Sequence, residues 1–163
     1  MATVGIIATV LPAKTPQESS QVVSSFTNYI ATFMASYKVD RRERVSKSSW
    51  GWTKEYYEPS GEPNIDVMRT DSLVSPYLGI CEFNLVRHRT GFHSTRADAT
   101  QDNTFVASDM AQHRHQYAYQ NAKWVQKTRE YFSNAGGKWY DCNEVGRGDN
   151  AGTTNLFGCW ETN

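Results

Sequence analysis

The sequence lacks an excess of either charge. Its 163 residues contain 17 lysines and arginines against 17 aspartates and glutamates. Long-range attraction to nucleic acid requires an excess of basic residues, so no nucleic acid is predicted as a partner. The sequence also lacks an apolar run long enough to cross a bilayer, and no membrane span is predicted. Without an internal repeat, a chain of this length favours one domain with one core.

Cysteine is scarce, with three residues in the chain. No two of them have the spacing of a zinc ligand set. Cys142 and Cys159 bracket most of a glycine-rich tail, residues 133–163, and a disulfide between them is predicted to close this tail. Such a bond favours an extracytoplasmic location, periplasmic or secreted, and a cytoplasmic location is the alternative. Cys81 lies in an apolar stretch and is expected to be a buried thiol.

Residues 1–13 are apolar and carry no charged side chain. One interpretation is the remnant of a secretory signal, although the basic region typical of such signals is missing. The other is an edge strand that adds to a sheet of the same chain or of a neighbouring chain. The apolar side chains of that strand would share one face: Val4, Ile6, Ala8 and Val10. Addition between chains would make the protein a homo-oligomer.

The clearest helix signal is the capping box Thr15-Pro16-Gln17-Glu18, which has proline at the first helical position. Apolar residues then recur at spacings of three and four: Val22, Phe26, Tyr29, Ile30, Phe33, Met34 and Tyr37. This spacing predicts an amphipathic helix that ends near Lys38.

Strand patterns follow the helix. Alternation predicts a strand over residues 48–57, and the prolines and glycine of Glu58–Pro63 are expected to break it before a second strand at Ile65. A long strand is predicted from Tyr77 to Thr90, with apolar residues on both faces. Ser94 or Thr95 can then cap a short helical turn that reaches Ala99.

Residues 104–132 read as a long hairpin with its turn at Asn121-Ala122. This turn would set Tyr119 opposite Trp124, and three further pairs would follow in the same register: Tyr117 opposite Gln126, His115 opposite Thr128, and His113 opposite Glu130. One face of the hairpin would then be aromatic and would face the core, and the other would be basic and exposed to solvent.

Two imidazoles on one strand face suggest a metal site. His113 and His115 would project together, with Glu130 across from them, so a two-histidine, one-carboxylate site for zinc or non-haem iron is geometrically open. The alternative is ordinary packing, with both rings hydrogen-bonded in an aromatic core. The identity of the ring nitrogens' partners decides between these.

Together the elements predict an α+β domain over residues 14–132: one N-terminal amphipathic helix packed on a curved antiparallel sheet of four to five strands, followed by the loop-rich tail of the same domain. This order resembles the cystatin-like superfold, and within it the NTF2-like domains, over about residues 15–132. Three segments are also similar to uncharacterised bacterial, apparently exported domains: Thr70–Tyr77, Tyr117–Val125, and Trp139–Cys142 with Cys159–Glu161.

The NTF2-like resemblance implies a conical pocket between helix and sheet. In such a pocket a carboxylate or histidine abstracts a proton while tyrosine hydroxyls hold an oxyanion, as in isomerases and dehydratases. The residues that would line it are Tyr29, His115, Tyr117, Tyr119, Trp124 and Glu130.

No motif in the sequence identifies an activity. The leading interpretation is a non-catalytic binding or self-assembly domain that recognises a partner, a small molecule or copies of itself. The pocket enzyme is the alternative, and a metal-binding protein with ligands His113 and His115 is the third hypothesis. No cofactor other than that metal is expected.

Overall fold

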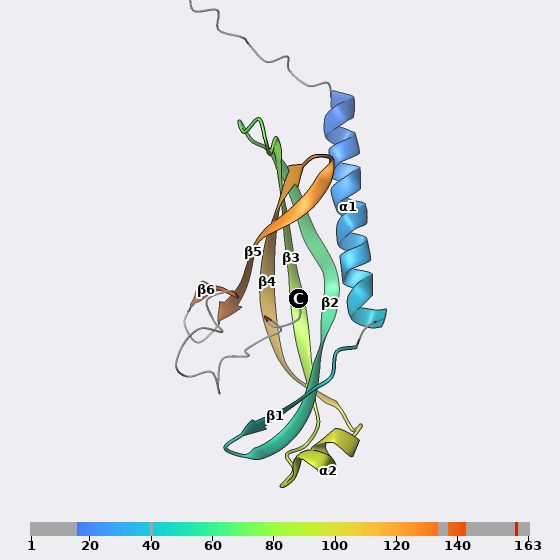
Figure 1. Ribbon diagram of the computed structural model, residues 1–163, viewed down its shortest axis with the longest axis vertical. Coiled ribbons are helices and arrows are strands. Elements are labelled where there is room, and N and C mark those ends of the chain that lie inside the picture. The colour runs from blue at the N-terminus through green and yellow to red at the C-terminus, as the bar shows by residue number, and fades with distance from the viewer. Residues whose placement is uncertain (1–15, 40, 134–136, 143–158, 160–163) are drawn as a thin grey trace, which may run out of the picture.

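A computed structural model describes residues 16–39, 41–133, 137–142 and 159 of the chain. One long helix lies against a curled antiparallel sheet in which each strand pairs with the next (Figure 1). The elements are α1 (Pro16–Val39), β1 (Arg44–Ser48), β2 (Gly51–Arg69), β3 (Tyr77–Arg89), α2 (Arg96–Gln101), β4 (Val106–Gln120), β5 (Lys123–Ser133) and β6 (Lys138–Asp141). The α+β class with one N-terminal helix on the sheet is confirmed. The sheet has six strands rather than the expected four to five, because short strands β1 and β6 extend its two edges.

Helix α1 starts at the predicted proline and ends one residue beyond Lys38. Its stripe at Val22, Phe26 and Ile30 is buried against the concave face of the sheet. The core there is made of inward side chains from β2, β3, β4 and β5: Tyr57, Tyr77, Cys81, Phe83, Leu85, Tyr117 and Trp124. None of the described helices is long and apolar enough to cross a membrane.

Strand β2 does not break where the sequence suggested. It runs through Glu58–Pro63 to Arg69, and the pairing with β3 shifts between Ser60 and Asn64. Gly61 in this bulge has a φ of 75°, which glycine adopts without the cost that other residues incur. Proline lacks an N–H donor, so it is tolerated in a strand that has a free edge.

Strand β3 starts at the predicted Tyr77, ends at Arg89, one residue before the predicted end, and lies in the middle of the sheet. Its inward residues alternate as expected, with Cys81, Phe83 and Leu85 buried. The opposite face is only half-buried, whereas the sequence indicated two covered faces.

The hairpin turn is at Asn121-Ala122, where both residues have the positive φ of a tight two-residue turn (49° and 59°). Tyr119 pairs with Trp124 as predicted. A bulge at Lys127 then shifts the register by one residue, so the two remaining predicted histidine pairs are wrong. His115 lies opposite Arg129 and His113 opposite Tyr131.

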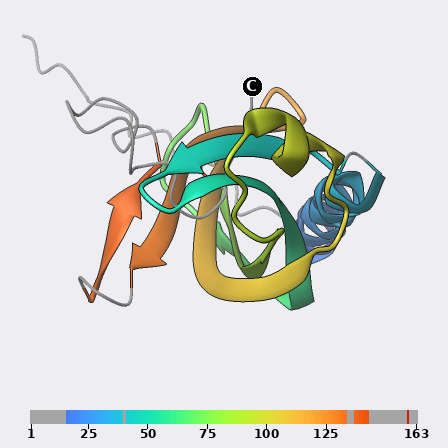
Figure 2. The same ribbon diagram turned by 90° about the horizontal axis from the view of Figure 1, so that it is seen from below.

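Helix α2 closes the end of the sheet away from the hairpin turn, as the view from below shows (Figure 2). Thr95 caps it by accepting a hydrogen bond from the Asp98 backbone N–H at 3.1 Å, in agreement with the sequence. The Lys54 ammonium anchors α2 to β2 by donating to the Thr100 carbonyl oxygen (2.9 Å) and to Asn103 Oδ1 (2.8 Å).

Candidate functional site

His113 and His115 both point into the core from β4, with 1% and 3% of their surface exposed. The ring of Phe83 contacts both imidazoles, stacked on His113 at 5.6 Å and edge-on to His115 at 5.0 Å. The two imidazole centroids are 6.1 Å apart. These contacts are those of rings that pack in an aromatic core.

Burial sets the protonation of this cluster. It lowers the pKa of His115 to about 3, with a smaller contribution from the neighbouring His113, so the His115 imidazole is neutral at physiological pH. Its Nδ1 lies 3.4 Å from the Tyr117 hydroxyl. Burial also raises the pKa of Cys81, directly opposite on β3, to about 12, which keeps a thiol there. The His115 imidazole and the Cys81 thiol are therefore both uncharged in the core.

Glu130 lies apart from the histidines. It is directly opposite Arg114 on the outer face of the sheet, where Glu130 Oε2 accepts a hydrogen bond from Arg114 Nε at 2.9 Å and forms an ion pair with Arg114 Nη2 at 2.9 Å. The bulge at Lys127 explains this position, because a one-residue shift moves a strand side chain to the other face. The predicted set of His113, His115 and Glu130 is therefore not brought together. Across the described part of the chain, no three His, Cys, Asp or Glu side chains are grouped to hold a metal ion.

The other predicted pocket residues pack around Phe26 of α1. Tyr117 and Trp124 have ring centroids 5.6 and 4.4 Å from that of Phe26, and Trp124 Nε1 donates to Ser25 Oγ at 3.0 Å. Tyr119 contacts Trp124 at 4.9 Å, and Tyr29, which is 39% exposed, contacts Tyr117 at 5.3 Å. Helix α1 thus occupies the space where the NTF2-like resemblance placed a pocket.

A groove that the sequence did not predict lies between α1 and the bulged part of β2. Its volume is about 380 Å³. The helix side is formed by Thr27, Ala31, Met34, Ala35 and Lys38, and the strand side by Pro59, Gly61, Glu62, Pro63 and Ile65. Two alanines on one helix face and two prolines in a strand are the sequence signals that could have indicated it.

The same groove borders an open sheet edge. Strand β1 pairs only with Gly51 to Glu55, so in the described structure the rest of β2 has β3 on one side and no strand on the other. After the bulge, Asn64 to Arg69 are again regularly paired with β3. An unpaired edge of this length presents N–H and C=O groups to an added strand.

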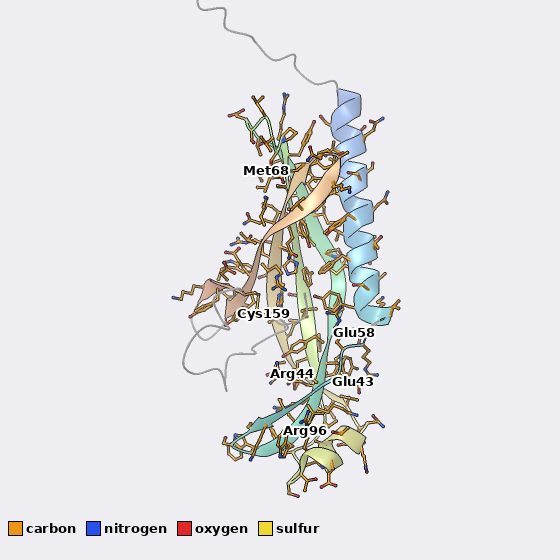
Figure 3. The ribbon with its side chains drawn as sticks, viewed as in Figure 1. Glu43, Arg44, Glu58, Met68, Arg96 and Cys159 are labelled. Carbon is orange, nitrogen blue, oxygen red and sulfur yellow. A yellow bond between two sulfur atoms is a disulfide. The ribbon has the colours of Figure 1, made fainter. Side chains whose placement is uncertain are left out.

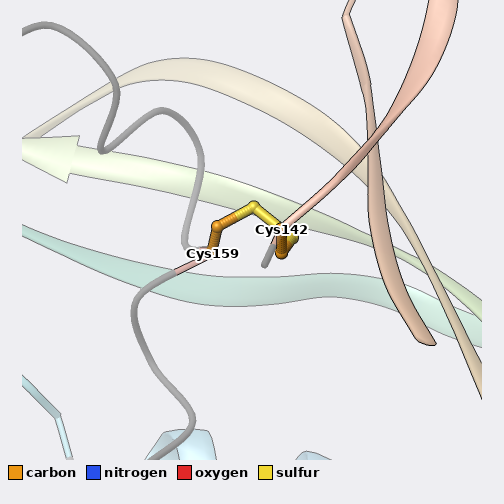
Figure 4. Close-up of a disulfide and its surroundings, with 2 residues drawn as sticks. All are labelled: Cys142 and Cys159. Carbon is orange, nitrogen blue, oxygen red and sulfur yellow. A yellow bond between two sulfur atoms is a disulfide. The ribbon is translucent and has the colours of Figure 1, made fainter. Parts of the chain in front are cut away.

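The predicted disulfide is present. Cys142 and Cys159 are bonded across a sequence separation of 17 residues, and Figure 4 shows the bond beside the sheet. Both cysteines are buried with Tyr131 in a small second cluster, on which Tyr140 packs. Strand β6 also belongs to the tail, and residues 134–136, 143–158 and 160–163 lie outside the described residues.

Comparison with known proteins finds no matching protein family, no similar curated protein and no similar solved structure. Any functional assignment therefore depends on the chemistry of this chain.

Proposed function

We propose that this protein is a non-catalytic binding and self-assembly domain, in which an extended apolar segment adds to the open edge of β2 beside α1. The observation that carries the proposal is the combination of an unpaired edge with an adjoining groove of about 380 Å³. Strand addition uses both features, since backbone hydrogen bonds give affinity and pockets for alternate side chains give specificity.

The groove suits small and branched apolar side chains. Met34 and Ile65 are partly buried against the core and supply apolar surface, while Ala31 and Ala35 are short enough to let another backbone approach. Lys38 and Glu62 add one charge of each sign. A strand without charged residues and with aliphatic side chains on one face matches this lining.

Residues 4–10 of a second copy have this composition. Their alternate residues are aliphatic: Val4, Ile6, Ala8 and Val10. No charged residue occurs before Lys14. Reciprocal exchange of these segments would give a symmetric dimer in which each copy fills the groove of its partner.

Strand direction favours the second copy over the same chain. Strand β2 runs from the end that carries Arg44 toward the end that carries Met68, whereas α1 runs the opposite way (Figure 3). A segment that turned back from Pro16 along α1 would therefore run parallel to β2. Every pairing in the described sheet is antiparallel, and parallel pairing is slightly less stable per residue.

Light scattering after size-exclusion chromatography tests the proposal. We expect the full chain to form dimers or larger assemblies, and a chain without residues 1–13 to be monomeric. Ala31→Glu places a carboxylate in the groove and should weaken assembly by about tenfold or more, as desolvation of an unpaired charge costs more than about 1.4 kcal/mol. Asn28→Glu is the matched control, since Asn28 is exposed on the same helix and does not line the groove.

A cross-link distinguishes the source of the strand. With cysteines at Ile6 and Ala31, a second-copy strand yields a covalent dimer, whereas a strand from the same chain yields an internally linked monomer. A full chain that stays monomeric at high concentration would overturn self-assembly. In that case the prolines and bulge of β2 would be understood as protection of the edge.

Three further points concern the location of the protein, its fold resemblance and the alternative function. The Cys142–Cys159 disulfide supports an extracytoplasmic location, because disulfides persist in oxidising compartments. A helix on a curled sheet supports the resemblance to the cystatin-like superfold. The isomerase or dehydratase alternative would require α1 to move, since Phe26 fills the space between Tyr117 and Trp124.

A further inference from the structure

The sheet extends beyond the last turn of α1 (Figures 1 and 3). At this end, charged residues occupy the strand positions that carry the core elsewhere. Arg44 is directly opposite Glu55, and Glu55 is directly opposite Arg89. In the next row Arg87 is opposite Asp109. Directly opposite residues share a face, so these side chains continue the concave face that carries the core.

The two carboxylates of this face are bound to one arginine. Arg87 Nη1 lies 3.8 Å from Glu55 Oε2, and Arg87 Nη2 donates to Asp109 Oδ2. Glu55 is 7% exposed, and its burial raises the pKa of the carboxyl group although Arg87, Arg44 and Arg89 act to lower it. With three arginines against two carboxylates, the face has an excess of positive charge.

Arg89 is the arginine that this network leaves available. In the part of the chain that the structure describes, no side-chain hydrogen bond or ion pair involves its guanidinium. The guanidinium carbon lies 5.3 Å from the ring centroid of Phe92, which is 44% exposed. A cation and an open aromatic face thus stand side by side.

Both residues line an open pocket of about 430 Å³ between the end of β3 and the start of β4. Thr90 and Gly91 continue the β3 side, and Val106 and Ala107 form an apolar wall on the β4 side. This volume falls in the range of small-molecule sites, roughly 300–1,000 Å³. The polar lining residues are Arg89 and Thr90 on the β3 side and Ser108 on the β4 side, and Arg89 is the charged one.

We propose that this pocket binds a small aromatic carboxylate, whose carboxylate pairs with Arg89 and whose ring packs against Phe92 and Val106. The planar guanidinium matches a carboxylate with two parallel hydrogen bonds. An aromatic ring beside Phe92 gains ring contact and covers the apolar wall. The site is independent of the groove between α1 and β2, which lies on other residues.

Titration of the full chain with benzoate, followed by amide proton–nitrogen correlation spectra, tests the site. We expect saturable shifts at residues 89–92 and 106–108. Arg89→Gln should weaken benzoate binding by about tenfold or more, the loss expected for a charge-assisted pair. Arg69→Gln is the control and should leave benzoate binding unchanged, because Arg69 is an exposed residue of β2 at the other end of the sheet.

Two further probes and a second variant assign the roles. Acetate should bind more weakly than benzoate because it has no ring to pack against Phe92. Phe92→Leu removes the ring on the protein side, so it should reduce the difference in affinity between benzoate and acetate. Inorganic phosphate that competed better than benzoate would overturn the assignment to aromatic carboxylates. The absence of saturable shifts, or equal benzoate affinity in an Arg89→Gln chain with an otherwise unchanged spectrum, would overturn the site itself.

Discussion

The ring of Phe26 lies directly against the backbone of Gly79, and a Cβ atom added to Gly79 would stand 2.6 Å from Phe26 Cζ. Phe26 is fully buried at the centre of the helix–sheet contact, so its ring has little room to move. The absence of a side chain at Gly79 is what allows α1 to approach β3 this closely.

Gly79→Ala should therefore destabilise the protein. Overpacking a filled core by one methyl group costs about 1–3 kcal/mol. Urea unfolding should show this loss in the free energy of unfolding. Gly91→Ala is the matched control because a Cβ there meets nothing within 4 Å, and it should be neutral or slightly stabilising. Equal stability of the two variants would contradict the close contact.

The sequence was most informative where one local signal determines an element. The proline start and the three-and-four spacing located α1, alternation located β3, and Asn121-Ala122 located the hairpin turn. In each case a short stretch carries the physical cause, namely capping, amphipathicity or a left-handed backbone conformation.

Long-range register was not predictable in the same way. The bulge at Lys127 lies within a run of three polar positions, Gln126 to Thr128, in which an inserted residue leaves no break in the apolar alternation. It nevertheless moved Glu130 to the outer face and separated it from the histidines. Pro59 and Pro63 were misleading for a related reason, since a proline breaks a central strand and is tolerated at an open edge.

Stability should fall in mild acid because His115 is buried in its neutral form. Its pKa in the folded protein is about 3, below the value near 6.5 of an unfolded chain, so the unfolded state binds the proton first. The contribution is complete above pH 6.5 and is lost as the pH falls from there toward 3. Between pH 7 and pH 5 we expect a loss of about 2 kcal/mol, measured by urea unfolding at each pH.

His115→Gln should flatten this pH dependence, whatever its effect on stability at neutral pH. His88→Gln, at a half-buried histidine on the opposite face of β3, is the control and should keep the wild-type slope. Other polar or titratable groups that face His115 are His113 and Tyr117 on β4, Arg129 on β5 and the Cys81 thiol on β3. If the slope survives in His115→Gln, a group other than His115 carries it.

Zinc should not stabilise the protein through His113 and His115. A ligand that binds only the folded state at 100 times its dissociation constant adds about 2.7 kcal/mol, which is readily measured. We expect the urea midpoint to be unchanged by zinc, because both imidazoles pack against Phe83 in the aromatic core and Glu130, the predicted third ligand, is bound to Arg114 on the outer face. A zinc-dependent increase that His113→Ala abolishes would instead support the metal hypothesis.

Reduction of the Cys142–Cys159 disulfide should destabilise the edge formed by β5 and β6. The bond closes a loop with a sequence separation of 17 residues, for which chain entropy predicts about 3 kcal/mol. It also holds Cys142, whose N–H donates to the Arg129 carbonyl oxygen at 2.8 Å, against the buried Tyr131. We expect hydrogen exchange to increase first in β6 and in the last residues of β5 when reductant is added.

The double variant Cys142→Ser, Cys159→Ser separates this effect from other actions of the reductant. It should show the increased exchange without reductant and no further change with it. The buried Cys81 thiol stays in both proteins, so it cannot account for a difference between them. Non-reducing mass spectrometry of the tail peptides measures the bond directly. Free thiols at both positions would remove the support that the disulfide gives to an extracytoplasmic location, because the bond is what ties this chain to an oxidising compartment.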